Sequence, residues 1–465
     1  MADATTTLSR LEADRVSGVR PSTRLRNIEL GLLLLALAVA AGAILLVQLG
    51  ALGHLDLDIV KLAGGVGVLA LALHVVLRFA ARDADPFILP IATAVNGLGI
   101  AEIYRIDLSP TGVRLDSDDG SSQILWTALG IGAAIVILFV VRNHRMLQRY
   151  TYIAMLASIV LLVLPLVPGL RLRGAAAYVW VHIGPAGSPL NFQPGEIAKI
   201  TLAIFFAGFL VARRDSLAMV GRRVLFVRLP RARDLGPIVV VWLLALGVIV
   251  GEHDLGTGLL LFGMFVAMLY VATGRTSWIV IGLVMAAAGA YAATRILTYV
   301  QGRIDNWLDA FDPTLYDARQ GSYQVVNGVF GLAHGGLFGT GLGQGRPDFT
   351  PAANSDFIIA SLGEELGLVG VFAILSLYLL LVSRGFRVGF SGPDDFGKLL
   401  AVGLAFVFAL QVFIVVGGVM RVIPETGLTT PFLAAGGSSL VANWMIAALL
   451  LRISNTIRSG PKTVI

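Results

Sequence analysis

The sequence predicts an all-α polytopic membrane protein with about twelve transmembrane helices and one large extracellular loop, 298–355. Hydrophobic residues make up 56% of the 465 residues and charged residues only 14%, whereas soluble domains carry about 25% charged residues. Apolar runs long enough to cross ~30 Å of hydrocarbon recur along the chain. The absence of cysteine excludes disulfides, thiol nucleophiles and cysteine-ligated metals.

Each apolar run is interpreted as one span. The run at 28–50 is too long for a signal peptide and lacks a small-residue cleavage site, so it is predicted to remain as a span. The arginine-rich residues 1–27 before it are predicted to form a basic tail, and residues 456–465 a second tail. The twelve predicted spans lie near 28–50, 58–78, 86–104, 122–141, 149–168, 193–212, 235–251, 255–273, 277–297, 356–383, 397–420 and 431–452.

The basic residues predict the orientation of the spans. With the N-terminus inside, the inside segments carry 24 Lys and Arg residues and the outside segments nine, as expected from the positive-inside rule. Both tails are then cytoplasmic, and the net charge of +6 reflects topology rather than nucleic-acid binding. The outside loops are 105–121, 169–192 and 298–355. The last is rich in glycine and aromatic residues, which predicts short helices at the membrane interface, and loops of this length are usually functional or disordered.

Asp356 is the leading candidate for chemistry, because it stands where the large loop enters a span. Acids within spans are costly and are functional candidates, although Asp356 fits a helix-capping role equally well. Glu364 lies about 80° round the helix from Asp356 and roughly 12 Å deeper. It is interpreted either as sharing a cavity with Asp356 or as a structural ion pair. Glu365 faces the other way and is predicted to pair within the bundle.

Other polar clusters fall on the same predicted face. Glu196 and Lys199 share one helix face at i, i+3 spacing, where they either neutralise each other or meet an anionic ligand. Asp254 is a helix cap for Thr257 or a ligand-binding group. Trp180 is interpreted either as an interfacial anchor or as a site residue. Arg421 and the run 424–439 form the last cluster, whose glycines and hydroxyl groups are alternatively explained by close helix packing. Together they point to an outer-leaflet site for an anionic, polar-headed lipid.

Some classes of chemistry find no support in the sequence. The six histidines show no metal-ligand spacing such as H-E-x-x-H, and no Walker A motif is present. No metal ligand is therefore assigned from the residues, and ATP is not expected to drive this chain.

Six segments, in the same order along the chain, resemble the motifs of one family of membrane proteins. They are similar to motifs of the SEDS proteins of shape, elongation, division and sporulation, typified by RodA, FtsW and SpoVE, and within that family to RodA of high-GC Gram-positive bacteria. The segments are FQPGEIAKI (192–200), HDLGT (253–257), NWLDAFDP (306–313), GGLFGTGLGQG (335–345), SDFIIASLGEELGLVG (355–370) and PETGLTTPF with GGSS (424–439). The resemblance spans 84–455, a ten-helix core, which leaves 28–83 as two additional N-terminal helices.

The resemblance implies a peptidoglycan glycosyltransferase that polymerises lipid II into a glycan strand at the outer face of the cytoplasmic membrane. It implies a class B penicillin-binding protein as the transpeptidase partner and Asp356 as the catalytic base. Whether a divalent cation (Mg or Mn) takes part is left open. Residues implied to bind substrate are Glu196, Lys199, Asp254, Arg303 and Glu364, with Trp180 matching less closely.

The sequence departs from the family pattern at a few positions, and other functions are also considered. His253 stands where proline is common, Thr430 replaces a leucine, and Ala434-Ala435 replace larger residues; these changes concern packing more than charge. The alternatives are a lipid II flippase, a scaffold that only recruits the transpeptidase, and a division role like that of FtsW instead of elongation and cell shape.

Overall fold

The computed structural model is described over ten stretches of the chain. These are residues 21–55, 57–108, 119–167, 170, 177–182, 191–218, 223–224, 227–228, 235–318 and 321–459. Much of the two predicted tails and parts of the loops 105–121 and 169–192 therefore lie outside the described residues.

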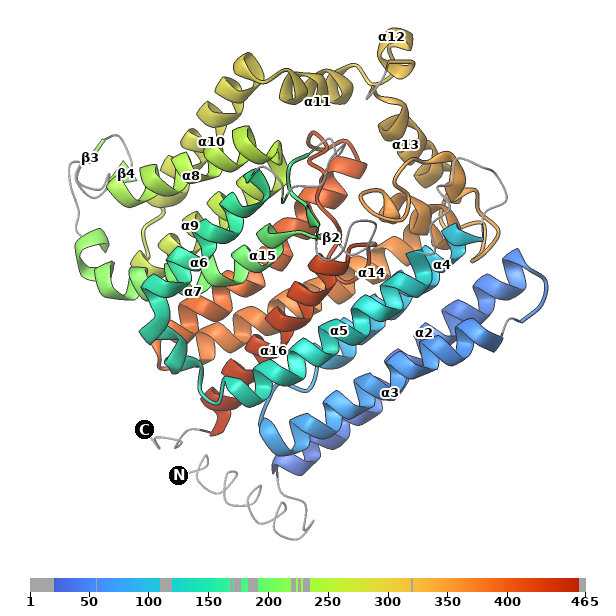
Figure 1. The fold of residues 1–465 in the computed structure, drawn as a ribbon, viewed down its shortest axis with the longest axis horizontal. Coiled ribbons are helices and arrows are strands. Elements are labelled where there is room, and N and C mark those ends of the chain that lie inside the picture. Colours follow the sequence, from blue (N-terminus) through green and yellow to red (C-terminus); the bar gives the residue numbers. More distant parts are fainter. Residues whose placement is uncertain are drawn as a thin grey trace, which may run out of the picture.

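Helices make up most of the described structure, and the long ones run as one bundle (Figure 1). Two antiparallel two-residue ribbons are the exception, β1 (Val181–His182) with β2 (Asn191–Phe192) and β3 (Arg223–Val224) with β4 (Val227–Arg228). The bundle helices are α2 (Pro21–Ala51), α3 (Leu57–Ala80), α4 (Ile88–Asp107), α5 (Asp119–Val140), α6 (Thr151–Val163), α7 (Pro194–Ala218), α8 (Gly236–Glu252), α9 (Leu255–Thr273), α10 (Ser277–Ile296), α14 (Ile358–Ser391), α15 (Asp395–Val419) and α16 (Gly437–Ser459). Short 3-10 turns, η1 (His144–Tyr150) and η2 (Leu164–Leu166), flank α6.

The all-α membrane class is confirmed, and each predicted span corresponds to one helix. Within the described residues, ten helices are long and apolar enough to cross a membrane. α4 and the shorter α8 are not among the ten, so the count of twelve stays a prediction. Three helix ends and two helix starts differ clearly from the predicted spans. α7 ends at Ala218 instead of near 212, α14 at Ser391 instead of near 383, and α16 at Ser459 instead of near 452. α2 begins at Pro21 instead of near 28, and α16 begins at Gly437 instead of near 431, because a non-helical segment with Pro424 and Pro431 precedes it.

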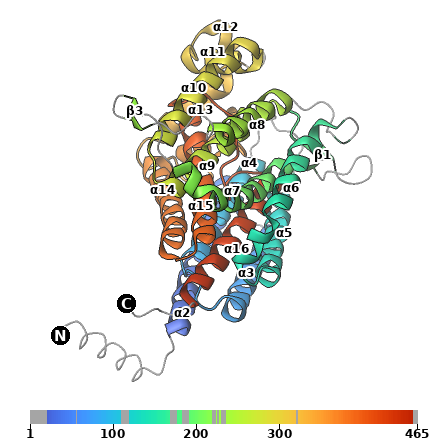
Figure 2. The ribbon, with the colours of Figure 1, turned by 90° about the vertical axis from the view of Figure 1, so that its left-hand side faces the viewer.

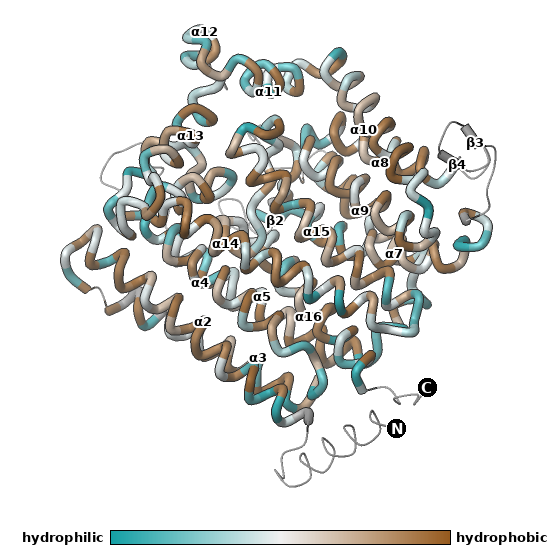
Figure 3. Tube along the Cα trace, turned by 180° about the vertical axis from the view of Figure 1, so that it is seen from behind, coloured by the Kyte–Doolittle hydropathy of each residue, from teal (hydrophilic) through white to brown (hydrophobic). Residues whose placement is uncertain are grey.

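The centre of the bundle is α15, and α10 lies at its edge. In the most apolar window of α15, 78% of the residues are buried, against 17% for α10. Small residues allow close helix contacts, as membrane packing requires. A Cβ added at Gly385 of α14 would lie 2.6 Å from the Ala405 Cβ of α15. Apolar residues dominate the bundle helices, while polar residues gather around α11 and α12 (Figure 3).

The large loop forms short helices, as predicted. They are α11 (Thr298–Leu308), α12 (Pro313–Tyr316) and α13 (Tyr323–Gly335), with the 3-10 turn η4 (Pro347–Phe349) after them. These helices lie across the end of the bundle opposite to the start of α2 and the end of α16 (Figures 1 and 2). The loop therefore covers one end of the bundle as ordered structure.

α14 is broken at Gly367, which the sequence analysis did not foresee. Gly367 has φ 68° and ψ −174°, a conformation open in practice only to glycine. The amides of Leu368 and Val369 donate to the Gly336 and Leu337 carbonyls at 3.0 and 3.1 Å. The carbonyls of Glu364 and Glu365 accept from the amides of Thr340 and Gly341 at 3.0 and 2.9 Å. The glycine-rich segment 335–346 thus replaces two helical hydrogen bonds, since every backbone group at membrane depth needs a partner.

A buried ion pair holds the same region to α4. The Arg105 guanidinium donates to Glu365 Oε1 at 2.8 Å and to the Gly345 carbonyl at 2.7 Å. Glu365 also accepts from the Gly343 amide at 2.7 Å. Glu365 therefore pairs within the bundle, as predicted, and joins α4, α14 and the glycine-rich segment.

We expect Arg105→Leu to lower the free energy of unfolding by about 3–5 kcal/mol, because it leaves the Glu365 carboxylate buried without its cation. The control is Arg214→Leu, whose ion pair with Asp395 is about half exposed and worth ~0–1 kcal/mol. Thermal unfolding of the detergent-solubilised protein measures both. Equal loss of thermal stability in the two variants would contradict the role given to the buried pair.

Candidate active site

Asp356 lies just before α14 and does not cap it. The helix begins at Ile358, and no side chain provides its N-terminal cap. The next residue, Phe357, is fully buried in a cluster with Val325 of α13 and Val419 of α15. Two residues earlier, Asn354 donates to Asp119 of α5 at 2.8 Å. The backbone around Asp356 is therefore fixed on both sides, while its own side chain stays partly exposed.

Three charged groups from other elements face Asp356. They are Arg303 on α11, Asp254 at the start of α9 and Glu425 in the connection between α15 and α16. Burial, together with the negative charges of Glu425 and Asp254, raises the pKa of the Asp356 carboxyl to about 7, against the opposing effect of Arg303. Within the described residues, the Asp356 carboxylate has no hydrogen-bond partner. A carboxylate with these properties is suited to accept a proton near neutral pH.

Arg303 is held by the connection that carries Glu425. Its Nη1 donates to the Glu425 carbonyl at 3.1 Å, and a Cβ added at Gly427 would lie 3.3 Å from its Nη2. One turn further along α11, Trp307 Nε1 donates to the Arg421 carbonyl at 3.0 Å, and Arg421 Nη2 donates back to the Trp307 carbonyl at 2.7 Å. α11 is thereby fastened to the start of this connection.

Asp254 caps α9, which is one of its two predicted roles. Its carboxylate accepts from the Thr257 amide at 2.8 Å and from the Thr257 hydroxyl at 2.7 Å. Burial raises the pKa of Asp254, and these two hydrogen bonds and Arg303 oppose the rise. The preceding His253 has φ 58°, which proline cannot adopt, and its ring lies between Tyr178 and Tyr299 at centroid distances of 4.9 and 5.1 Å.

Glu196 and Lys199 form a buried pair on the first turns of α7. Lys199 Nζ lies 2.5 Å from Glu196 Oε2 and donates to Gln411 Oε1 of α15 at 3.0 Å. Gln411 in turn donates to the Thr429 carbonyl at 2.7 Å. Only 1% of Lys199 is exposed. The two side chains neutralise each other, so the predicted contact of Lys199 with an anion stays a prediction that would require Lys199 to change partners.

Glu364 faces the glycine-rich segment. Its carboxylate accepts from the Arg346 amide at 3.0 Å and lies 3.0 Å from His334 Nδ1. The charges facing Asp356 come from other residues. The observed contacts of Glu364 therefore agree with a structural role. Its role in substrate binding stays a prediction.

Trp180 lies immediately before β1, where the chain leads towards α7. β1 pairs with β2, and Pro194 follows that strand as the first residue of α7. Trp180 is partly buried. It therefore stands at the Glu196 side of the site, and its proposed role stays a prediction.

Sequence reasoning missed two residues of this region, Glu425 and Gln411. Glu425 lies within the PETG segment, where an acid beside a proline was a usable signal. Gln411 lies within an apolar run and carries no comparable signal. Burial raises the pKa of Glu425, and Arg303 opposes the rise.

A divalent cation was left open by the sequence. Within the described residues, no group of three or more His, Asp or Glu side chains is arranged to hold a metal ion.

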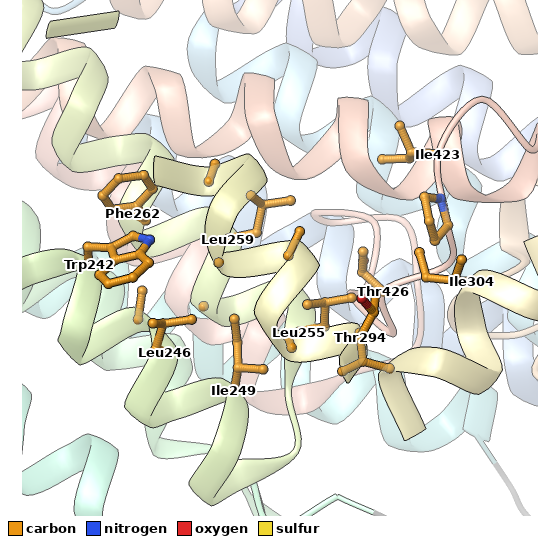
Figure 4. Close-up of a pocket in the computed structure, with 18 residues that line it drawn as sticks. Trp242, Leu246, Ile249, Leu255, Leu259, Phe262, Thr294, Ile304, Ile423 and Thr426 are labelled. Carbon is orange, nitrogen blue, oxygen red and sulfur yellow. The ribbon is translucent and has the colours of Figure 1, made fainter. Parts of the chain in front are cut away.

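An apolar cavity of about 240 Å³ lies beside these charged groups (Figure 4). Its walls come from α8, α9 and α10, and it reaches Val300 and Ile304 of α11 and Thr426 of the α15–α16 connection. Ile304 is the neighbour of Arg303 in the chain. The labelled lining residues are Trp242, Leu246, Ile249, Leu255, Leu259, Phe262, Thr294, Ile304, Ile423 and Thr426.

Comparisons with known proteins place this geometry in a family. A family model described as a cell cycle protein, covering FtsW, RodA and SpoVE, matches residues 89–459. The chain belongs to the SEDS family.

Within this family, RodA proteins of mycobacteria are strongly similar to the chain. It is 42% identical over 457 residues to the peptidoglycan glycosyltransferase RodA of Mycobacterium tuberculosis, covering 98% of this chain and 96% of that protein. It is 29% identical over 383 residues to a probable peptidoglycan glycosyltransferase FtsW of Geobacter metallireducens, covering 81% of this chain and 96% of that protein.

Solved structures agree with the SEDS fold. The crystal structure of the Thermus thermophilus rod shape determining protein RodA covers 80% of this chain and 97% of its own, with a TM-score of 0.56 and 25% identity. A chain from a peptidoglycan synthase complex that coordinates polymerization and crosslinking covers 81% of this chain and 99% of its own, with a TM-score of 0.61 and 25% identity. All candidate residues lie within the matched region 89–459, and α2 and α3 precede it.

The raised pKa of Asp356 predicts a pH-dependent difference in stability between the wild type and Asp356→Asn. The folded-state value of about 7 lies above the unfolded value of ~3.9. The stability that Asp356 contributes is therefore fully present below the unfolded value and is lost as the pH rises through 7. We expect Asp356→Asn to gain thermal stability relative to the wild type between pH 5 and pH 8, measured by unfolding in detergent.

Asp312→Asn is the control for this measurement. Asp312 is exposed and caps the start of α12, and hydrogen bonds from Thr314 lower its pKa, so it titrates below this pH range. A difference from the wild type that is the same at pH 5 and pH 8 for Asp356→Asn would show that Asp356 has an ordinary pKa.

Proposed function

We propose that the protein is a peptidoglycan glycosyltransferase that polymerises lipid II into glycan strands for cell elongation and shape. The observation that carries the proposal is Asp356, a partly exposed carboxylate that has no hydrogen-bond partner among the described residues and a pKa of about 7, facing Arg303 beside an apolar cavity. A proton acceptor, a cation and an apolar cavity match the acceptor sugar, the pyrophosphate and the lipid of such a substrate. The names of the mycobacterial RodA relatives support the same activity.

The site is proposed to face the outside of the cytoplasmic membrane. The excess of Lys and Arg in the segments assigned to the inside supports this orientation. The start of α2 and the end of α16 lie at the end of the bundle opposite to α11, α12 and α13 (Figure 1). The termini are then cytoplasmic, and Asp356 meets substrate in the outer leaflet.

In the proposed reaction Asp356 acts as a general base. It takes the proton from the 4-hydroxyl of the acceptor sugar as the hydroxyl oxygen bonds to C1 of the donor sugar. The bond from C1 to the pyrophosphate oxygen breaks with inversion, and polyprenyl pyrophosphate leaves with the bonding electrons. Arg303 stabilises the negative charge that develops on this group. Asp254 and the Glu196–Lys199 pair fix the helix ends around it.

The apolar cavity is proposed to receive the first isoprenoid units of the lipid. Its lining is almost wholly apolar, and its α11 wall adjoins Arg303. A lipid chain that enters between α8, α9 and α10 would thus bring its pyrophosphate to the cation. Burial of apolar chain in the cavity contributes about 25 cal/mol per Å² to binding.

A class B penicillin-binding protein is proposed as the partner. The complex among the similar structures joins polymerization with crosslinking. The outer loop of this chain exposes large apolar side chains, including Leu308, Phe311, Phe330 and Phe338. Exposed apolar patches of this kind mark interaction surfaces, and this one lies on the side where a transpeptidase domain would stand.

Asp356→Ala is expected to reduce lipid II polymerisation by about 10²–10⁴-fold, because it removes the general base. The measurement is strand formation from labelled lipid II by the purified protein with its partner. Asp312→Asn, an exposed acid of the same loop, is the matched control and should retain the wild-type rate.

The same assay gives two further checks on the base. The wild-type rate should rise roughly tenfold between pH 6 and pH 8, since the ionised fraction of a group with a pKa near 7 changes by that factor. Wild-type polymer formation by Asp356→Ala would refute the assignment. Lipid II translocation in liposomes without polymer formation would favour the flippase alternative.

Ala286→Phe is expected to raise the KM for lipid II several-fold with little change in kcat, because it fills the cavity and removes binding shared by the ground state and the transition state. Ala288→Phe is the control, since Ala288 is exposed on the same helix and is absent from the described cavity lining. Steady-state kinetics with lipid II of full tail length separate the two parameters. An equal effect of both variants would show that the cavity does not hold the lipid.

A further inference from the structure

α2 touches the glycine-rich segment at a point where both backbones need glycine. A Cβ added at Gly50 of α2 would lie 2.3 Å from the Leu342 carbonyl oxygen. A Cβ added at Gly343, whose φ is +83°, would lie 2.8 Å from the Val47 carbonyl oxygen and 2.9 Å from the Ala51 amide nitrogen. The neighbouring atoms on both sides are backbone, so a side chain at either position displaces the chain itself.

Polar and apolar contacts strengthen this junction. Gln344 Nε2 donates to the Gly50 carbonyl at 3.0 Å. Leu342 packs against a cluster that contains Val47 of α2 and Tyr104 of α4. The segment therefore lies in a defined position on the end of α2.

The other side of the same segment is bonded to the two acids of α14. Glu365 accepts from the amides of Gly343 and Gly345 at 2.7 and 3.2 Å. Glu364 accepts from the Arg346 amide at 3.0 Å. Residues 343–346 are thus enclosed between α2 and the first turns of α14, immediately before the chain turns back to Asp356.

The position of α2 is itself fixed far from this junction. Arg26 lies 2.6 Å from Glu29 and also donates to the Ala84 carbonyl, and Glu29 lies 2.6 Å from His74 of α3. A Cβ added at Gly97 of α4 would lie 2.3 Å from the Ala40 Cβ of α2. α2 is therefore anchored at its inner end, packed closely at its middle, and in contact with the glycine-rich segment at its outer end.

We infer that Gly50 is a positioning residue of the active site, and that α2 acts through segment 342–346 to place Asp356. The inference rests on the proposed function, because it assigns α2 a part in that reaction. α2 precedes the region 89–459 that the family model matches. Its contact with segment 342–346 therefore supports the active site from outside that region. Glu364 and Glu365 connect this contact to Asp356, because both bond the segment and both belong to α14, which Asp356 precedes.

The test compares Gly50→Ala with Gly42→Ala in the full-length protein. Both changes replace glycine by alanine within α2 and raise helix propensity equally. A Cβ at Gly42 meets no atom within 4 Å, whereas one at Gly50 meets the Leu342 carbonyl. Gln344→Ala is a milder third variant that removes one hydrogen bond and adds no atom.

Hydrogen exchange and kinetics report on separate parts of the inference. We expect Gly50→Ala to speed amide exchange across 342–346 and to lower kcat about tenfold or more, since a misplacement of ~1 Å costs up to 10²-fold in rate. KM for lipid II should change less than kcat. Gln344→Ala should shift both readouts in the same direction by less, and Gly42→Ala should match the wild type.

Three results would overturn the inference. They are unchanged exchange in Gly50→Ala, faster exchange with an unchanged kcat, and equal effects in Gly42→Ala. If Gly50→Ala fails to fold, wild-type exchange and kcat in Gln344→Ala overturn it. Failure of the wild type to polymerise lipid II would instead refute the proposed function, and the exchange result would still decide whether α2 holds the segment.

Discussion

The architecture of the active end depends on the exchange of two backbone hydrogen bonds at Gly367. In a continuous helix the amides of Leu368 and Val369 would bond the carbonyls of Glu364 and Glu365. Here both amides and both carbonyls bond the glycine-rich segment instead. An unsatisfied peptide group at this depth costs several kcal/mol, so the segment and the broken helix stabilise each other. The exchange allows a polar loop to enter the bundle and brings Glu364 and Glu365 against that loop.

The acidic residues of this region differ in whether their carboxylates have bonded partners. Glu365 and Glu196 each have a cation at close range, and Glu364 accepts from a backbone amide. Asp356 has neighbouring charges but no bonded partner among the described residues. This difference separates residues that hold the structure from Asp356, the proposed general base. It also explains why three acids with similar sequence settings receive different roles.

The sequence was sufficient for the membrane class, the approximate spans and the short helices of the large loop, because apolar runs and turn residues are local signals. The Asp254 cap was readable from Thr257 three residues later, and the pairing of Glu196 with Lys199 from their helical spacing. The break at Gly367 was not readable, since its hydrogen-bond partners lie about thirty residues away and 54 glycines make a single one uninformative. The late start of α16 was missed for a related reason: residues 431–436 are apolar enough to resemble a span, while the Ala435 amide bonds the Asn354 carbonyl.

The contact between Gly50 and Gly343 limits how this protein can be recombined with its relatives. A domain that only anchors a core can be exchanged or removed without regard to the sequence of that core. Here two glycines, almost three hundred positions apart, must both be present for the backbones to meet. Chimeras that take the first two helices from one protein and the outer loop from another would therefore work only when both parents carry glycine at the matching places. Substitutions at these two positions should depend on each other during evolution.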